Sequence, residues 1–280
     1  MDAQPHFFDG QLTTLMDAWS TTIDDMSVLI CELTNAEWTL PSPCPGWSVG
    51  DIAAHVVGVE RRLAGDALPD HEPDWSALPN IRSDEFSQFM ERDVDIRRTQ
   101  SRTETVAELL EVIPRRRAQL QALDADPELM VAGPAGSQVP LGRIMRMRVF
   151  DLWVHEQDIR QSVHKPGHEA SIGAHVTAEI LVSALPVIWG KKVAAQPGQS
   201  IHLKVSGAIS FECSVVVGDD GRAGFTANPD QPTSSLAMDW LTYVALSTGR
   251  STVELLADQI TIAGDAELAH RCVKLANIAP

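Results

Sequence analysis

Two segments far apart in the sequence carry residue types that bind metals. The first reads PCPGWSVGDIAAH over residues 43–55, and the second reads RVFDLWVHEQDIR over residues 148–160. In the second segment Asp151 and His155 are four residues apart, so a helix would place both side chains on one face. In the first, His55 adjoins an apolar stripe formed by Ile52, Val56, Val59 and Leu63. That stripe predicts a helix with its apolar side facing the interior, so we expect the His55 imidazole to point toward other helices.

Together these residues would supply two imidazoles and one carboxylate. Three ligands of this kind leave a coordination position open, as in catalytic zinc sites. Two other interpretations stay open on the pattern alone. A histidine beside an apolar stripe also fits a buried structural histidine. The same ligand set serves non-heme iron oxygenases, although their ligands normally lie on barrel strands and no strand is predicted around His55 or Asp151.

Both segments resemble the mycothiol-dependent maleylpyruvate isomerase family, a branch of the DinB-like helical-bundle superfamily. The likeness consists of Pro-Cys-Pro-Gly-Trp with His55 eight residues beyond its tryptophan, and of Asp151 and His155 followed by Asp-Ile-Arg. From Gly207 onward the chain resembles the carboxy-terminal domain of the same family. The resemblance implies a divalent metal, usually zinc, held by His55, Asp151 and His155, with mycothiol as the thiol cosubstrate.

One residue departs from the family pattern, which has glutamate where this chain has Asp151. A carboxylate one methylene shorter can still ligate, but it would pull a metal toward its helix and alter the coordination. The resemblance therefore predicts a metal- and mycothiol-dependent thiol S-transferase or isomerase acting on a small electrophile, with transfer ahead of maleylpyruvate isomerisation proper. A rival hypothesis is a nonenzymatic protein whose carboxy-terminal domain binds a small molecule.

The expected chemistry follows from the properties of a thiol. A free thiol has a pKa of about 8.5, and coordination to a divalent cation deprotonates it. The thiolate would attack the electrophile, and a cationic group would steady the negative charge that develops on the substrate. Arg160, Arg222 and Arg250 are the candidates for that catalytic role, although no spacing rule brings them to the metal.

Two short motifs suggest other enzymes but lack the required context. Residues 46–50 match the G-x-S-x-G elbow of serine hydrolases, yet the elbow needs a buried strand before it, and the prolines at 41, 43 and 45 cannot belong to a central strand. Ser48 is instead expected to cap a helix together with Asp51. The pair at 155–156 begins like the H-E-x-x-H motif of zinc peptidases, but position 159 is isoleucine and the second histidine is missing.

Other polar residues lie near the proposed ligands. Asp158 follows His155 by three residues and could accept its second N–H, or could be a surface acid. Cys44 could be a reactive thiol, but we expect a small apolar group that fixes its loop. The basic clusters are expected to be solvated helix faces, although an arginine near the metal could hold a substrate carboxylate through its bidentate fork. They comprise Arg115, Arg116, Arg117, Arg143, Arg146 and Arg148.

Composition limits the classes of partner. The chain has 280 residues, 44% of them hydrophobic, and a formal net charge of −16, which repels nucleic-acid phosphates and anionic lipid surfaces. Four separated cysteines without a C-x-x-C pair argue against a zinc knuckle and a disulfide scaffold. We see neither a signal peptide in the first ten residues nor a window of membrane-span length. We therefore expect a cytoplasmic monomer or homodimer whose partners are a low-molecular-weight thiol and a small electrophile.

Periodicity predicts an α+β protein of two domains. Helical patterns cover residues 8–34, 48–64, 83–98, 103–123 and 141–163. A turn-rich break at 164–168 separates a metal-binding, DinB-like four-helix bundle, residues 1–166, from an α+β domain, residues 167–280, in which a sheet is backed by helices. In the second domain we expect a helix at 172–188, strands at 201–205, 211–217 and 259–262, a hairpin turn at 218–221, and helices at 234–247 and 265–276.

Overall fold

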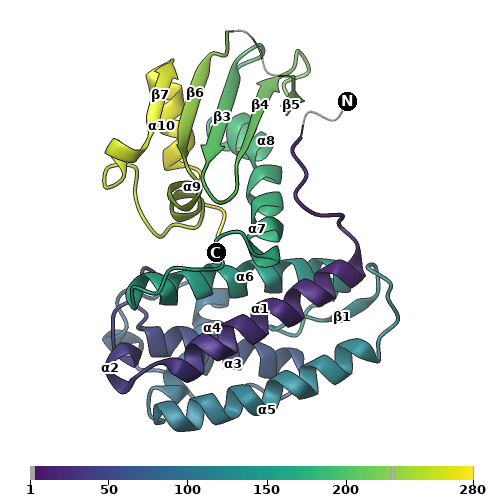
Figure 1. Cartoon of the computed structure of the whole chain (residues 1–280), viewed down its shortest axis with the longest axis vertical. Helices are drawn as coiled ribbons and strands as arrows, with labels where there is room; N and C mark the ends of the chain where they lie inside the picture. Colours follow the sequence, from purple (N-terminus) through teal and green to yellow (C-terminus); the bar gives the residue numbers. More distant parts are fainter. Residues whose placement is uncertain (1–3, 228, 230, 280) are drawn as a thin grey trace. The chain divides into compact units, whose positions relative to one another are not determined.

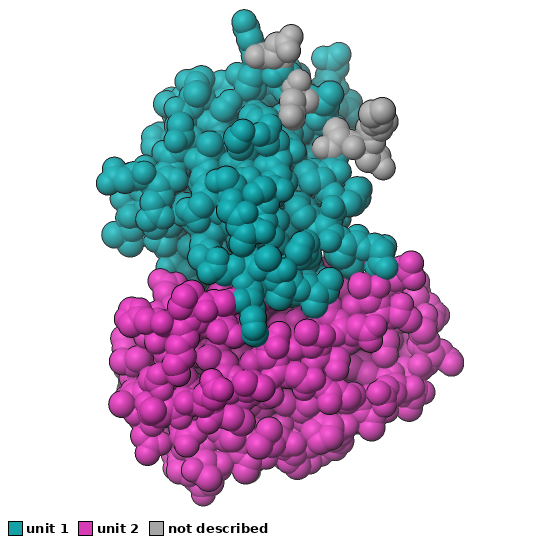
Figure 2. All heavy atoms as spheres, in the orientation of Figure 1, with its two compact units in different colours: residues 1–9, 168–280 teal, residues 10–167 magenta. Residues whose placement is uncertain are grey.

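The computed structural model describes residues 4–227, 229 and 231–279. These residues form two compact units, which are coloured separately in Figure 2. The helical unit comprises residues 10–167, and the sheet unit comprises residues 4–9 and 168–279. We had expected the division one residue earlier, with residues 4–9 among the helices.

Residues 4–9 belong to the sheet unit because side chains hold them there. The backbone N–H of Phe7 donates to the Glu179 carboxylate at 2.9 Å, and Nδ1 of His6 lies 3.2 Å from the same group. The Phe7 ring packs edge-on against Phe211, with ring centroids 5.3 Å apart. This short segment has no hydrophobic period of its own, and contacts with distant residues determine its position. The sequence pattern therefore could not assign it to a domain.

The helical unit contains the five helices that periodicity predicts (Figure 1): α1 (Leu12–Glu32), α3 (Val49–Leu63), α4 (Glu85–Arg97), α5 (Arg102–Gln121) and α6 (Leu141–Ser162). It also contains α2 (Asn35–Trp38), a 3-10 turn (Trp75–Ala77) and a small hairpin of β1 (Met130–Ala132) and β2 (Gln138–Pro140), where we expected only a loop. Both α1 and α3 pack against α5 and α6, and α4 lies on α3.

The core of the helical unit is filled by side chains that recur at helical spacing. They include Leu15, Trp19, Ile23, Met26 and Ile30 of α1, Ile52 and Val56 of α3, Leu109 and Ile113 of α5, and Leu152 and Trp153 of α6. Burying one such aliphatic or aromatic side chain stabilises the fold by roughly 1.5–3 kcal/mol. This packing fixes which faces of α3 and α6 meet, and therefore where His55 and Asp151 point.

A capping box begins α3, as predicted. The Ser48 hydroxyl accepts from the Asp51 backbone N–H at 3.2 Å, and the Asp51 carboxylate accepts from the Ser48 backbone N–H at 2.8 Å. Ser48 thus satisfies the open end of a helix and does not stand on the strand-to-helix turn that a serine hydrolase requires.

Replacing Ser48 by alanine should lower the free energy of unfolding by about 1 kcal/mol, because the cap is lost while α3 keeps its packing. Urea denaturation measures this change. Thr21→Ala, at an exposed position within α1, is the control and should alter stability by less than about 0.5 kcal/mol. A folded Ser48→Ala protein without catalytic turnover would restore the serine hydrolase hypothesis.

The sheet unit contains a five-stranded sheet in the order β5-β4-β3-β6-β7. Its strands are β3 (Ser200–Ser206), β4 (Phe211–Val217), β5 (Ala223–Thr226), β6 (Ser234–Asp239) and β7 (Thr261–Gly264). β3 and β6 pair in parallel, and the other neighbours are antiparallel. The helices are α7 (Ile172–Ser183), α8 (Leu185–Val187), α9 (Trp240–Ser247) and α10 (Ala266–Lys274), with a π-helical turn at Ile188–Lys192 and a 3-10 turn at Ala257–Gln259. The unit is the predicted sheet backed by helices (Figure 1).

The helix predicted over residues 234–247 is wrong in its first half. Ser234–Asp239 is strand β6, and α9 begins only at Trp240. Burial alternates along β6, where Leu236 and Met238 are buried and Ala237 is partly exposed. Alanine, leucine and methionine favour a helix in isolation, but β6 hydrogen-bonds to β3 on one side and β7 on the other. Pairing in the tertiary structure overrides the local preference.

An apolar cavity lies within the sheet unit, between the sheet and its helices. Its lining includes Leu203 of β3, Cys213 of β4, Met238 of β6, Tyr243 of α9 and Cys272 of α10. Burial raises the pKa of both Cys213 and Cys272 to about 12, so these thiols stay neutral at physiological pH. Neither cysteine therefore has the thiolate character of a reactive thiol.

One helical run corrects the expectation that no segment reaches membrane-span length. Residues Ile172–Lys192, which include α7, α8 and the π-helical turn, are long and apolar enough to cross a membrane by length and composition. In the structure 61% of the most apolar window of this run is buried. A buried core helix of a soluble protein passes the same test of length and composition.

Candidate metal centre

His55 of α3 lies beside Asp151 and His155 of α6. One ligand atom from each residue lies within 4.8 Å of the others. Nε2 of His55 is 3.3 Å from Oδ2 of Asp151, and Nε2 of His155 is 3.6 Å from Oδ1 of the same carboxylate. The two imidazole rings stand edge to face, with centroids 5.0 Å apart. Helical spacing places Asp151 and His155 on one face of α6, and the packing of α3 against α6 adds the third residue.

These separations fit a divalent cation. Zinc bonds to imidazole nitrogen and carboxylate oxygen are about 2.0–2.2 Å long, so two ligand atoms of a tetrahedral site lie about 3.3–3.6 Å apart. The 3.6 Å between Nε2 of His155 and Oδ1 of Asp151 falls in that range, and Nε2 of His55 lies 3.3 Å from the other oxygen of the same carboxylate. Both histidines are buried, whereas Asp151 keeps 30% of its side-chain surface exposed, so the carboxylate is the part of the group that solvent reaches most.

The orientation of His155 is set by Asp158. Nδ1 of His155 lies 3.0 Å from Oδ2 of Asp158, which is buried and is therefore not the surface acid that we considered. Because a carboxylate accepts hydrogen bonds, Nδ1 donates to Asp158, and in that tautomer Nε2 presents a lone pair. That lone pair faces Oδ1 of Asp151 at 3.6 Å, too far for a hydrogen bond. A cation between the two atoms would satisfy both.

The surroundings favour the protonation states of metal ligands. Burial lowers the pKa of His55, so its imidazole is neutral at physiological pH. Burial alone would raise the pKa of Asp151, but the neighbouring His55 imidazole and the Arg148 guanidinium outweigh it and hold that pKa well below its usual value. Neutral imidazoles and an ionised carboxylate are the forms that bind a divalent cation.

Arg148 donates to the carboxylate of Asp151, a contact we did not predict. We expected Arg148 and Arg116 on solvated helix faces, but both are buried. Nη1 of Arg148 donates to Oδ2 of Asp151 at 2.5 Å, while Nε and Nη2 donate to Oε1 of the buried Glu60 at 3.1 and 2.9 Å. The i, i+3 spacing of Arg148 and Asp151 was the sequence signal that could have revealed the first contact.

Trp47 forms one wall of the site. The centroid of its ring lies 4.9 Å from that of His55 and 5.8 Å from that of His155. Nε1 of Trp47 donates to Oε2 of Glu91 at 2.9 Å, and Arg98 donates to Oε1 of the same buried carboxylate at 2.5 Å. Trp47 entered the sequence motif without a role, and its packing against both imidazoles gives it one.

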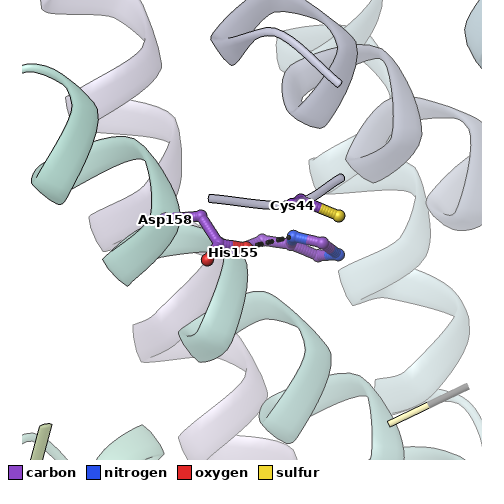
Figure 3. Close-up of side chains that lie close together, drawn as sticks. All are labelled: Cys44, His155 and Asp158. Carbon is purple, nitrogen blue, oxygen red and sulfur yellow. Dashed lines mark hydrogen bonds and ion pairs between the residues drawn. The ribbon is translucent and has the colours of Figure 1, made fainter. Parts of the chain in front are cut away.

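A second group of metal-binding residue types shares His155. It consists of Cys44, His155 and Asp158, which lie together in Figure 3, with one ligand atom from each within 4.8 Å of the others. Cys44 belongs to the tight turn before α3, where its backbone N–H donates to the Ser42 hydroxyl at 3.2 Å. Because Nδ1 of His155 is already bonded to Asp158, this group is a weaker cation site than the one around His55.

Two of the three arginines expected to act on the substrate, Arg160 and Arg250, have side-chain partners of their own. Arg160, in the last turn of α6, pairs with the buried Glu156 at 2.8 Å. Arg222 is exposed just before β5, and Arg250 donates to the Thr248 carbonyl at 2.7 Å after α9. Arg222 and Arg250 belong to the sheet unit, whereas the trio belongs to the helical unit. A role for these arginines at the metal centre stays a prediction.

The sequence of the chain matches the model of a known protein family. Residues 19–160, just over half of the chain, match the model of the mycothiol maleylpyruvate isomerase N-terminal domain. The chain belongs to this family. The matched region runs from α1 to α6 and contains His55, Asp151 and His155.

The fold similarity extends over nearly the whole chain. Two crystal structures of a mycothiol-dependent maleylpyruvate isomerase, one with a histidine replaced by alanine, each align with 92% of this chain and 95% of their own. Both have a TM-score of 0.56 and 16% sequence identity to this chain. At that identity the likeness shows the fold alone. Among curated proteins, no sequence is significantly similar to this one.

Proposed function

We propose that the chain is a divalent-metal-dependent enzyme that uses mycothiol to transfer a thiol to, or isomerise, a small electrophile. The proposal rests on one observation, the trio His55, Asp151 and His155, in which Asp158 leaves Nε2 of His155 with its lone pair. Zinc is the expected metal, because two imidazoles and a carboxylate are ligands of catalytic zinc sites. The family, and the structures that share the fold, are named for mycothiol and maleylpyruvate, which supports the thiol cosubstrate.

Each residue of the site has a defined task in this chemistry. A divalent cation held by the trio would supply the positive charge that keeps a thiol ionised at neutral pH. His55 and His155 offer neutral nitrogens, and Asp151 offers a negative oxygen. Asp158 keeps the proton on Nδ1 of His155, and the Trp47 ring covers one side of the two imidazoles.

The substrate determines which product forms. A thiolate that attacks a carbon bearing a leaving group forms a carbon–sulfur bond, and the leaving group departs with the bonding electrons. A thiolate that adds reversibly to an activated double bond permits rotation before it is expelled, which isomerises the alkene. Negative charge develops on the substrate in both cases, and we propose Arg160, Arg222 and Arg250 as the groups that steady it. To contact the substrate, Arg160 must first break its ion pair with Glu156.

We expect transfer to predominate over maleylpyruvate isomerisation, because Asp151 is shorter than the glutamate of the family pattern and leaves more room beside the cation. The test offers mycothiol with maleylpyruvate in one reaction and with a halogenated arene or a bimane in another, and follows product mass. Reactions without thiol are the control. Asp151→Glu should retain the metal and shift the product balance toward isomerisation. Efficient maleylpyruvate turnover with no adduct from any electrophile would reverse this order.

A further inference from the structure

The two oxygens of the Asp151 carboxylate have different surroundings. Oδ2 accepts from Nη1 of Arg148 at 2.5 Å and lies 3.3 Å from Nε2 of His55. Oδ1 has Nε2 of His155 at 3.6 Å, beyond hydrogen-bond distance. Arg148 therefore occupies one oxygen and leaves the other facing His155, where a cation can lie between the two atoms.

The position of Arg148 is itself fixed by Glu60. Nε and Nη2 of Arg148 donate to Oε1 of Glu60 at 3.1 and 2.9 Å, so the same planar guanidinium contacts both carboxylates. Glu60 is fully buried, accepts from Nε1 of Trp19 at 3.2 Å and lies 3.8 Å from Nε of Arg116. Because the N–H donors of a guanidinium point in fixed directions, Arg148 cannot move with one carboxylate and keep its hydrogen bond to the other.

We propose that Arg148, anchored by Glu60, is a positioning residue that makes Asp151 a one-oxygen ligand and so keeps a coordination position free for the thiol. This inference rests on the proposed function. Carboxylates bind cations through one oxygen or through two, and the second mode fills an additional position. A three-residue site stays open to a substrate only while each residue supplies one atom. By hydrogen-bonding to Oδ2, Arg148 leaves Oδ1 as the single oxygen with which Asp151 binds the cation.

The charges around Arg148 determine which substitutions can test its role. Its guanidinium and the Glu60 carboxylate form a buried ion pair, with Arg116 beside Glu60 and Asp151 beside Arg148. Removing one of them would leave an unpaired buried charge, whereas replacing both with neutral side chains of similar size is often tolerated. The informative variant is therefore the double substitution Glu60→Gln with Arg148→Met. Arg148→Lys keeps the charge but lacks the fork that reaches both carboxylates.

The test uses the full chain loaded with Co²⁺ as the metal and mycothiol as the thiol. Chelator competition measures the affinity for Co²⁺, and the thiolate-to-cobalt charge-transfer absorption measures thiol binding. The double variant should bind Co²⁺ at least as tightly as the wild type, because both oxygens of Asp151 become available. It should need roughly 10–100-fold more thiol for half-saturation, the range typical of lost outer-sphere partners. Arg148→Lys should fall between the two, and Arg143→Met, exposed on the same helix, should match the wild type.

The outcomes separate this inference from the proposed function. A wild-type chain that binds no Co²⁺, or that shows no absorption with thiol, overturns the metal centre itself. A normal wild type together with a double variant of unchanged thiol dependence overturns only the role of Arg148. Loss of Co²⁺ from the double variant also overturns it, because Arg148 would then support metal binding and not the open position. If the double variant does not fold, the same two measurements on Arg148→Lys decide.

Discussion

Replacing either histidine of the trio should empty the metal centre. Wild-type protein purified without chelator should carry about one divalent cation per chain, the occupancy of a single three-ligand site. His55→Ala and His155→Ala should each lose it, because an aspartate and one imidazole remain. The loss of affinity should exceed the roughly 10–100-fold cost of altering an outer-sphere partner. Elemental analysis of each purified protein gives the metal content.

The control for these variants is His270→Ala, which removes an exposed histidine of α10 in the sheet unit. It should keep the metal content of the wild type. Circular dichroism should show unchanged helix content in all three variants, because the buried apolar face of α3 and α6 is left intact. Full metal retention in both His55→Ala and His155→Ala would exclude the trio as the binding site.

Asp158→Asn should weaken metal binding by roughly 10–100-fold without abolishing it. The carboxylate of Asp158, whose Oδ2 lies 3.0 Å from Nδ1 of His155, holds the ring proton on that nitrogen. An asparagine can turn its amide N–H toward Nδ1, which would move the ring proton to Nε2 and block the lone pair that faces Asp151. Competition with a chelator of known affinity measures the change.

Gln161→Ala, exposed near the end of the same helix, is the matched control and should leave metal affinity unchanged. Asp158 is proposed to act through His155. Adding Asp158→Asn to the His155→Ala variant should therefore cause no further change in metal affinity. Equal metal affinity in Asp158→Asn and the wild type would mean that another group orients His155.

Local patterns in the sequence were sufficient for the helices and for half of the site. Ser48 and Asp51 defined the start of α3 because a capping box involves residues three apart, and the structure contains both of its hydrogen bonds. The pairing of Asp151 with His155 on α6 likewise follows from a four-residue spacing. These features depend only on residues three or four apart, within about one turn of a helix.

Contacts between distant residues could not be obtained from such spacing. The apolar stripe indicated that His55 points inward and the family resemblance supported its place in the trio, but no spacing rule joins it to Asp151, 96 residues away. Arg148 looked like a surface arginine, because nothing near it in sequence shows that Glu60, 88 residues away, is buried beside it. Trp47 was a motif residue without a function until its ring was found against both imidazoles.

The sequence by itself determined where the five long helices of the helical unit lie, which residue types could bind a cation, and that a sheet backed by helices follows. Only the tertiary structure decided that Ser234–Asp239 is a strand, that residues 4–9 join the sheet unit, and that Arg148 holds one oxygen of Asp151. Helical periodicity and capping are properties of neighbouring residues, whereas strand pairing and buried ion pairs depend on which surfaces meet when the whole chain packs.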